Sequence, residues 1–475
     1  MATPNTTMFT RVTTRFANVI AILANETSNG DDRERETVKQ TRVQEGNMWT
    51  RTRPSGRVRA TTVLLFSLLA LTRMAAPQSL GIHPAIATAA SSGTFTRTGS
   101  LITARSEHTA TLLPNGKVLI TGGLESTTLD APSSILASAE LYDPGTGTFS
   151  PAGNMTAARS MHASTTLADG RVLIVGGYGY GAGTATGAAT ALATAELYDP
   201  STGSFTPTRN MATARGWPTA ILLASGNVLV VGGGTAAELY DPDSGMFSAT
   251  GPYVGHGACD FCAPSTLLAD GTVLFPGQYP TQIYDPVTNW FKVAGMMISD
   301  HSTAALLPNG QVLFAGGEDL GRSSSAELYD PTIGTFTPTG SMMSQRVWHT
   351  LTLLPDGTVL TTGGETDGCA GSMCSFVGGV ASAELYDSSK GIFLDAGSMT
   401  TARETHTATL LNDGRVLIAG GVSYGGIGIF SGSLLTAELY TPGTLAPAPT
   451  LISLTGDGHG QGEVPLKPFV SGEDD

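Results

Sequence analysis

Charged residues are scarce in this sequence. Only 13% of the 475 residues are Asp, Glu, Lys or Arg, whereas charged disordered polymers and long coiled coils are rich in them. Long apolar runs are also missing, because no stretch reaches the roughly 18 residues that a membrane-spanning helix requires. We therefore expect no transmembrane span, and the chain is long enough to bury a sizeable core.

Basic residues are especially few beyond the N-terminal part. The chain has 25 Lys and Arg against 39 Asp and Glu, a net charge of −14. Residues 1–92 hold 11 basic and 6 acidic residues, which leaves 25 − 11 = 14 basic and 39 − 6 = 33 acidic residues for the rest. An acidic body repels phosphate backbones, so nucleic acid is excluded as the expected partner.

Cysteine is rare as well, with four residues in two local pairs. Cys259 and Cys262 form C-x-x-C, and Cys369 and Cys374 form C-x4-C. The favoured interpretation is one or two small loop disulfides, which suits an exported protein. A zinc site made from all four thiolates and a set of free thiols are the alternatives.

The N-terminal residues are typical of export, with an unusual prefix. Residues 1–56 are polar without periodicity, and we interpret them as disordered. Residues 57–92 resemble a signal peptide and linker, because arginines precede the short apolar run 61–71 and small residues follow it. A start at Met48 would give a signal of ordinary length. A short membrane anchor or a plain tail is the alternative, and the favoured location is secreted, extracellular or periplasmic.

Glycine is abundant, with 60 residues, and much of it belongs to a repeat. A glycine pair recurs seven times, made of a turn glycine and a glycine six residues later with an apolar strand between them: PNGKVLITGG (114–123), ADGRVLIVGG (168–177), ASGNVLVVGG (224–233), ADGTVLFPGQ (269–278), PNGQVLFAGG (308–317), PDGTVLTTGG (355–364) and NDGRVLIAGG (412–421). A further glycine follows in six copies, and Gln278 replaces it in the fourth. Asn-Gly and Asp-Gly between apolar runs favour tight hairpins. Each copy therefore predicts two strands, a and b.

A second recurrent segment predicts strands c and d. AELYDP or a close variant begins at residues 139, 195, 237, 281, 326, 383 and 437. In six copies an aromatic residue follows the tyrosine after seven positions, beyond a turn rich in Pro, Gly and Ser. Four strands per repeat match one blade of a β-propeller.

The glycine pairs and the repeated tyrosines resemble the kelch-repeat family, specifically its bacterial exported type. The resemblance covers residues 93–442 and implies an all-β, seven-bladed β-propeller of four-stranded kelch blades. Tyr440 lacks its downstream aromatic residue, and GTFTRTGSL at 93–101 provides an unpaired strand d with Phe95. We therefore expect this N-terminal strand to complete the last blade and close the ring. Residues 443–475 are predicted to be a linker and the truncated start of a further β-module.

A binding face is suggested by the lengths of the connections. The b–c loops are long in blades 6, 7, 1 and 2 and short in blades 3 and 4. These four blades are contiguous on a closed ring, so we expect a raised wall on one side of a central funnel.

The same four blades share Arg-x-x-His at the start of strand a. The candidate ligand-binding residues are His108, His162, His349 and His406, together with Trp217 and Trp348, which each precede the histidine position of their blade. The structural alternative is that the arginines and histidines tie neighbouring blades together and the tryptophans pack between blades. Exposed tryptophans would instead stack on sugar rings.

The function favoured by this pattern is a non-catalytic binding scaffold for a protein or polysaccharide ligand, with no metal and no cofactor and as a monomer. The alternative is a galactose oxidase-like copper oxidase or another enzyme on the same fold. Such oxidases use a cysteine-linked tyrosine, a second tyrosine and two histidines, and this sequence has no Tyr-His dipeptide. No hydrolase signature is present either.

Overall fold

The computed structural model describes residues 93–126, 133–180, 189–233, 237–251, 265–276, 281–299, 301, 303–318, 322–370, 373–424 and 430–443. The predicted prefix, the signal-like segment and nearly all of the C-terminal tail lie outside these ranges. The described residues belong to the unit His83–Asp475 and form strands and turns without a helix. Among them, no helix is long and apolar enough to cross a membrane.

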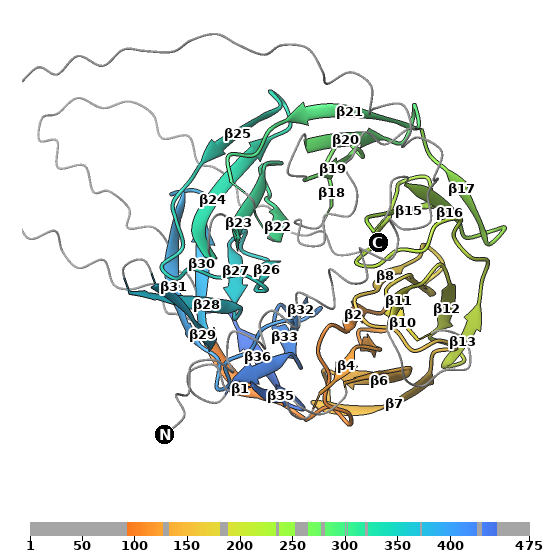
Figure 1. The fold of residues 1–475 in the computed structure, drawn as a ribbon, viewed down its shortest axis with the longest axis horizontal. Helices are drawn as coiled ribbons and strands as arrows, with labels where there is room; N and C mark the ends of the chain where they lie inside the picture. The colour runs from red at the N-terminus through yellow and green to blue at the C-terminus, as the bar shows by residue number, and fades with distance from the viewer. Residues whose placement is uncertain are drawn as a thin grey trace, which may run out of the picture. The chain divides into compact units, whose positions relative to one another are not determined.

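Seven four-stranded antiparallel sheets form the blades of a β-propeller (Figure 1). Their strands a to d are β2 (Thr109–Leu112), β3 (Val118–Thr121), β6 (Ser138–Asp143) and β7 (Thr148–Asn154) in blade 1; β8 (Ala163–Thr166), β9 (Val172–Val175), β12 (Ala195–Asp199) and β13 (Ser204–Pro207) in blade 2; β14 (Thr219–Leu222), β15 (Val228–Val231), β16 (Glu238–Asp241) and β17 (Met246–Ala249) in blade 3; and β18 (Thr266–Leu267), β19 (Val273–Phe275), β20 (Thr281–Asp285) and β21 (Trp290–Gly295) in blade 4.

The remaining blades follow the same order. Blade 5 contains β22 (Thr303–Leu306), β23 (Val312–Glu318), β24 (Arg322–Asp330) and β25 (Thr335–Pro338); blade 6 contains β26 (Thr350–Leu353), β27 (Val359–Thr362), β30 (Ser382–Asp387) and β31 (Ile392–Ser398); and blade 7 contains β32 (Thr407–Leu410), β33 (Val416–Ala419), β36 (Ala437–Thr441) and β1 (Thr94–Arg97).

Blade 7 is completed by the first described strand of the chain. β1 pairs antiparallel with β36, with Phe95 opposite Tyr440. The rings of these two residues lie 4.9 Å apart, which reproduces within one blade the tyrosine–aromatic pair that the other six blades form between their own strands c and d. The predicted seven-bladed fold and its closure by the N-terminal strand are therefore confirmed.

The core lies between the blades. Strand b is buried along its whole length in most blades, as in β3 and β9. One buried cluster combines Leu119 and Met155 of blade 1 with Ile174 and Tyr198 of blade 2, and comparable clusters lie at the other junctions. The second glycine of the repeat allows this close approach, because a Cβ at Gly122 would collide with the carbonyl oxygen of Arg159 in the next blade.

Candidate functional site

Five buried ion pairs repeat around the ring. In each, an arginine ahead of strand a meets the glutamate of strand c in its own blade, at 2.6–2.9 Å: Arg105–Glu140, Arg159–Glu196, Arg215–Glu238, Arg346–Glu384 and Arg403–Glu438. All five guanidinium side chains are inaccessible to solvent. These arginines are therefore structural ties, and none of them is presented to a ligand.

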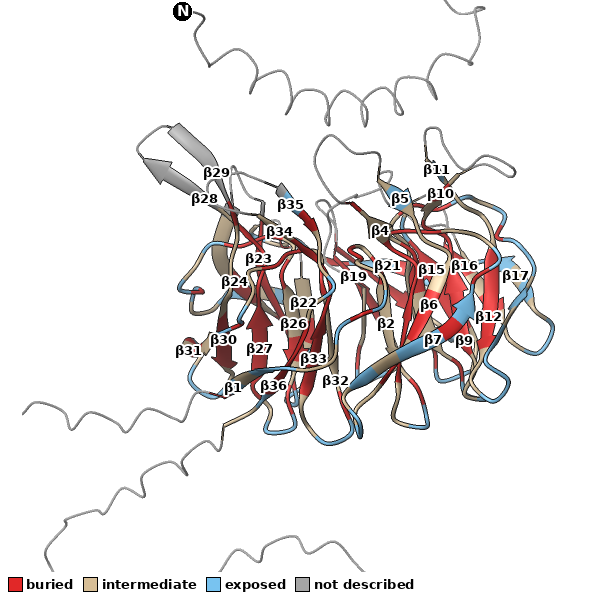
Figure 2. Cartoon of the chain, turned by 90° about the horizontal axis from the view of Figure 1, so that it is seen from below, coloured by how far each residue is buried: buried red, intermediate tan, exposed pale blue. Residues whose placement is uncertain are grey.

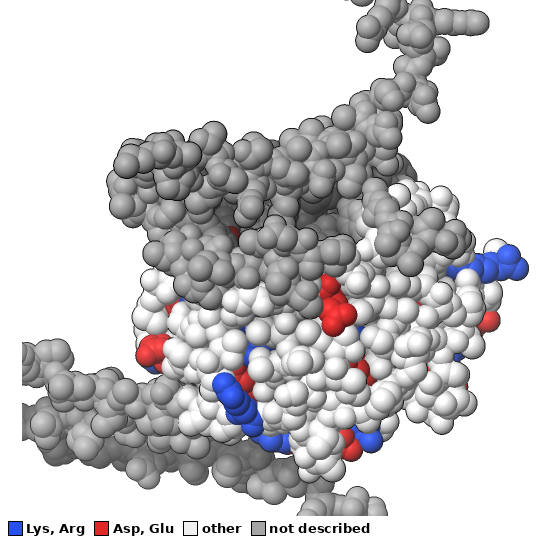
Figure 3. Space-filling view, turned by 60° about the horizontal axis from the view of Figure 1, so that its bottom comes forward, with Lys and Arg blue, Asp and Glu red and all other residues white. Residues whose placement is uncertain are grey.

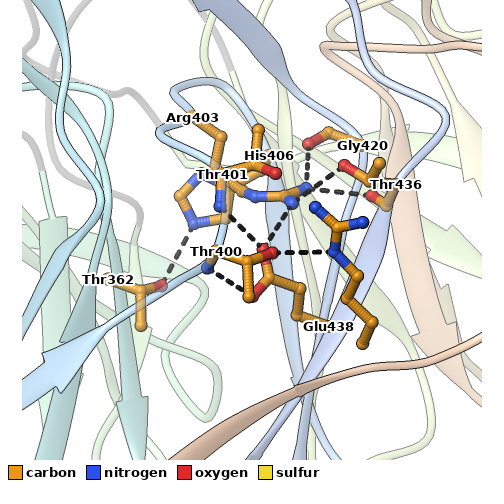
Figure 4. A network of polar contacts seen from close by, with 9 residues as sticks. Thr362, Thr400, Thr401, Arg403, His406, Gly420, Thr436 and Glu438 are labelled. Carbon is orange, nitrogen blue, oxygen red and sulfur yellow. Dashed lines mark hydrogen bonds and ion pairs between the residues drawn. The ribbon is translucent and has the colours of Figure 1, made fainter.

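Figure 4 shows this arrangement in blade 7. Arg403 donates to the carbonyl oxygens of Gly420 and Thr436 at 2.7 and 3.0 Å, in addition to its pair with Glu438. The backbone amide of Thr400, in the connection from blade 6, donates to the Glu438 carboxylate at 2.7 Å. The ion pair therefore holds the strands of blade 7 together and also anchors the segment that connects blade 6 to blade 7.

Blades 4 and 5 depart from this pattern. Gln282 stands at the glutamate position of blade 4. In blade 5, Ser299 stands at the arginine position, and His301 takes over as the partner of Glu327. The His301 ring lies 2.8 Å from the carbonyl oxygen of Gly316 through Nδ1 and 2.9 Å from Glu327 through Nε2. The sequence pattern placed His301 one position early but did not reveal this substitution of an imidazole for a guanidinium.

The four predicted histidines lie at the junctions between blades. Nε2 of His162 is 3.0 Å from the hydroxyls of Thr109 and Thr121 in the preceding blade. His406 contacts Thr362 of blade 6 in the same way, at 3.1 Å. Equivalent contacts join His108 to Thr407 and His349 to Thr303. The structural alternative, in which the histidines tie neighbouring blades, accounts for these contacts.

The environment of these histidines keeps them neutral. All four are buried, and burial lowers the pKa of His108 to about 3 with further lowering by Arg105 and Arg403. Burial likewise holds the pKa of His162, His349 and His406 well below the ordinary value. Their role in ligand binding stays a prediction, and their burial disfavours direct contact with a ligand.

The predicted wall on blades 6, 7, 1 and 2 is confirmed. Each of these four b–c connections forms a small hairpin: β28 (Glu365–Ala370) with β29 (Met373–Gly379), β34 (Val422–Tyr424) with β35 (Phe430–Ser433), β4 (Leu124–Glu125) with β5 (Ser134–Ile135), and β10 (Tyr178–Gly179) with β11 (Thr190–Ala191). Figure 2 shows β4, β5, β10, β11, β34 and β35 along one edge of the ring. We call this edge the hairpin face.

Side-chain and backbone contacts join the hairpins to one another. The amide of Ser433 donates to the carbonyl oxygen of Ser126 at 2.7 Å, and this contact links blades 7 and 1. Tyr180 donates to the carbonyl oxygen of Ser133 at 3.0 Å and links blades 2 and 1. Within blade 7, Tyr424 donates to Glu404 at 2.9 Å. These contacts connect the hairpins of blades 7, 1 and 2 to one another.

The two tryptophans meet over the axis of the ring. The ring centroids of Trp217 and Trp348 are 5.6 Å apart, although Trp217 precedes strand a of blade 3 and Trp348 precedes strand a of blade 6. Blades 3 and 6 are not neighbours, so these side chains can touch only by pointing inward across the channel. Both are half-buried. The sequence pattern indicates both residues as candidates, but it does not indicate their contact.

Three further residues occupy the same position in their blades as Trp217 and Trp348 and have the same backbone conformation. The residue before the histidine position has a positive φ in five blades: Glu107 (55°), Met161 (52°), Trp217 (51°), Trp348 (60°) and Thr405 (50°). Backbone bonds connect four of them, from the amide of Thr405 to Trp348 O, from Glu107 to Thr405 O and from Met161 to Glu107 O. The tryptophan contact closes this arc, and we call the five residues the axial ring.

The predicted disulfides are only partly within the described residues. Cys259 and Cys262 lie outside them. Cys369 and Cys374 stand directly opposite each other in the antiparallel register of β28 and β29. A disulfide between Cys369 and Cys374 stays a prediction, and the backbone register favours it over a site that unites all four cysteines.

The fold is similar to that of a known copper enzyme. A fungal alcohol oxidase of the AA5 family, solved in complex with copper, aligns with a TM-score of 0.57 and 19% sequence identity, over 74% of this chain and 76% of that chain. No protein-family model and no curated protein matches the sequence. At this identity the likeness shows the β-propeller fold alone.

Among the described residues, the junction histidines and the repeated tyrosines are not gathered into a copper site. Within the described ranges, no three His, Cys, Asp or Glu residues lie close enough together to hold a metal ion. The repeated tyrosines are buried between blades, as Tyr142 is beside Phe149, and the hydroxyl of Tyr142 bonds to Thr98. The junction histidines are engaged with threonines.

Proposed function

We propose that this protein is an exported binding module of the kelch-repeat type, which takes a protein or glycan ligand on the hairpin face. The observation that carries the proposal is the tryptophan pair over the axis, bordered by four contiguous hairpins. Half-buried tryptophans concentrate binding energy when a partner covers them. On the described part of the face seen in Figure 3, charged atoms form scattered spots and no charged patch.

Shortening one hairpin tests this location. Residues 366–378 of the β28–β29 hairpin can be replaced by a short Gly-Asn turn, and the purified protein can be screened against immobilised polysaccharides and cell-surface proteins. The proposal expects a ligand whose binding the shortened variant loses. A variant with Lys117→Ala on the opposite turn face should still bind. Loss of binding in the Lys117→Ala variant alone would place the site elsewhere.

An oxidase is the second candidate, and the similarity to the copper alcohol oxidase favours it. Reconstitution with Cu(II) followed by desalting and metal analysis distinguishes the two functions. The binding module should retain far less than one copper per chain. Stoichiometric copper with oxidation of a primary alcohol would establish the oxidase instead.

Export is part of the same proposal. The supporting pattern is the arginine-flanked apolar run 61–71 with small residues after it. N-terminal sequencing of the mature protein should find a start between residues 75 and 93. A mature protein that retains residues 1–60 would contradict export by this segment.

A further inference from the structure

Blade 5 is tied by a titratable side chain where five other blades use an arginine. His301 is buried, and each of its ring nitrogens lies within hydrogen-bond distance of an oxygen. Nδ1 is 2.8 Å from the carbonyl oxygen of Gly316, and Nε2 is 2.9 Å from Oε1 of Glu327. A guanidinium keeps its charge throughout the physiological pH range, whereas an imidazole ordinarily loses its proton between about pH 5 and 8. The tie in blade 5 can therefore respond to pH.

The partners of the ring determine its protonation state. A carbonyl oxygen and a carboxylate oxygen both accept hydrogen bonds and have no hydrogen to donate. The Glu327 carboxylate also accepts from the backbone amides of Ile298 and Ser299, at 3.0 and 2.8 Å. Burial raises the pKa of Glu327, but the hydrogen bonds from His301 and from these amides lower it to below its usual range. Glu327 is therefore ionised, and both ring nitrogens of His301 carry a hydrogen.

Within blade 5, Glu327 is the charged group that faces the ring. Strand β23 contributes Phe314, whose ring centroid lies 6.4 Å from that of His301. The segment 296–299, which leads in from blade 4, has no ionisable side chain. Asp300 directly precedes His301 in the sequence and lies outside the described residues.

The neighbouring blades place their own titratable groups differently. His349 of blade 6 approaches Gly316 but stays neutral, because burial, Arg346 and His301 lower its pKa. The guanidinium of Arg346 is bound to the glutamate of its own blade at 2.6 Å. Blade 4 has the uncharged Gln282 at the glutamate position. Among these groups, the Glu327 carboxylate is the one that holds the second proton on the ring.

We propose that the pair of His301 and Glu327 is a pH-sensitive latch, which holds the chain where it enters blade 5. In the closed latch the doubly protonated ring joins β23 to β24, and the same carboxylate binds the amides of Ile298 and Ser299. If the ring loses a proton, one buried nitrogen faces an acceptor without a hydrogen between them, which is costly.

The latch should weaken as the pH rises. The native ring holds a proton that the unfolded chain releases above about pH 6.5, so the native state binds more protons there. The contribution of the pair is fully present below that pH and is lost as the buried ring gives up its proton at higher pH. Neither blade 4 nor blade 5 has the arginine–glutamate pair, so we expect the loosening at the junction of these two blades.

Hydrogen exchange resolved to single amides tests the latch in the full chain. The probes are the amides of Ile298 and Ser299. The matched references are the amides of Met343 and Ser344, which donate to Glu384 in the arginine-tied blade 6 at 2.7 and 3.2 Å. Base catalysis of exchange acts on both sets, so the ratio of their rates reports how firmly each carboxylate holds its segment. This ratio should rise about tenfold between about pH 5.5 and 8.5.

The variant Glu327→Gln supplies a second readout. Its amide group can donate to Nε2 of a neutral ring while Nδ1 still donates to the carbonyl oxygen of Gly316. The variant should therefore keep a constant rate ratio over the same pH range, with near-ultraviolet circular dichroism to establish that it is folded. In the wild type at pH 6, nitrogen NMR of labelled histidine should show His301 with both nitrogens protonated, its signal assigned by its loss in His301→Gln.

Three outcomes would overturn the latch. One is a wild-type rate ratio that does not change with pH, and another is a His301 ring with a single protonated nitrogen at pH 6. The third is a pH-dependent ratio that the folded Glu327→Gln variant retains. None of these measurements involves a ligand, so the latch and the proposed function stand or fall separately.

Discussion

At the scale of single residues, the two partners of a buried polar contact are replaced together where the repeat varies. Where blade 3 has Pro218 in place of the junction histidine, blade 2 has Ala163 in place of the threonine that would contact it. Where blade 4 has Gln282 in place of the strand-c glutamate, Asp260 stands at the arginine position of the sequence. Losing both members avoids leaving one buried polar group without its partner, which is the costly case.

Breaking one buried ion pair should therefore destabilise the ring strongly. Glu438→Ala leaves Arg403 charged and without its carboxylate, and the free energy of unfolding should fall by about 3–5 kcal/mol. Lys390→Ala removes an exposed pair with Asp387 and should cost less than about 1 kcal/mol. Urea unfolding measures both changes, and equal small losses would show that the buried pair is dispensable.

The junction histidines should make stability depend on pH. Because the pKa of His108 falls from 6.5 to about 3 on folding, the unfolded chain binds more protons between these values. The contribution of this residue is fully present above pH 6.5 and is lost as the pH falls toward 3. His108→Gln should reduce the dependence of the urea midpoint on pH between 7 and 4.5, and an unchanged dependence would contradict the assignment.

At the scale of elements, β1 joins the two ends of the propeller. Without it, blade 7 would present the edge of β36 to solvent, and exposed edges invite aggregation. A chain that begins at residue 93 keeps β1, whereas one that begins at residue 99 lacks it. We expect the shorter chain to unfold at a lower temperature and to form oligomers. Equal melting temperatures and equal monomer fractions in size-exclusion chromatography would show that β1 is not needed for closure.

The β28–β29 hairpin offers a second test at this scale. Cys369 and Cys374 are opposite each other in its register, and cross-strand partners have the proximity that a disulfide requires. Peptide mapping of the secreted protein under non-reducing conditions should recover the two residues in one linked fragment. Alkylation of both thiols in the native, unreduced protein would rule the disulfide out.

At the scale of the whole molecule, the sequence was sufficient for the architecture. Seven copies of the glycine pair predicted the number of blades, and the unpaired Tyr440 with Phe95 predicted closure, because both depend on repetition rather than on side-chain direction. The lengths of the b–c connections likewise predicted the wall. The contact between Trp217 and Trp348 could not be predicted in this way, because the two residues lie in blades that are not neighbours. Both also have a left-handed backbone conformation, which the sequence repeat does not indicate.

The partner of Glu327 was missed for a related reason. His301 stands at the axial-ring position of its blade, yet its side chain occupies the place of an arginine that belongs two residues earlier. A repeat alignment compares residues at equal positions, so it does not detect a side chain that reaches the same carboxylate from a different one. Spatial substitution of this kind appears only in the structure.

One binding measurement decides whether the tryptophan pair on the hairpin face is the binding site. The wild-type protein, the double variant Trp217→Ala/Trp348→Ala and the outer-strand control Trp290→Ala would be compared against the same panel of polysaccharides and cell-surface proteins. We expect a ligand that the wild type and Trp290→Ala bind equally and the folded double variant does not bind. A ligand that the double variant binds as tightly as the wild type would contradict it.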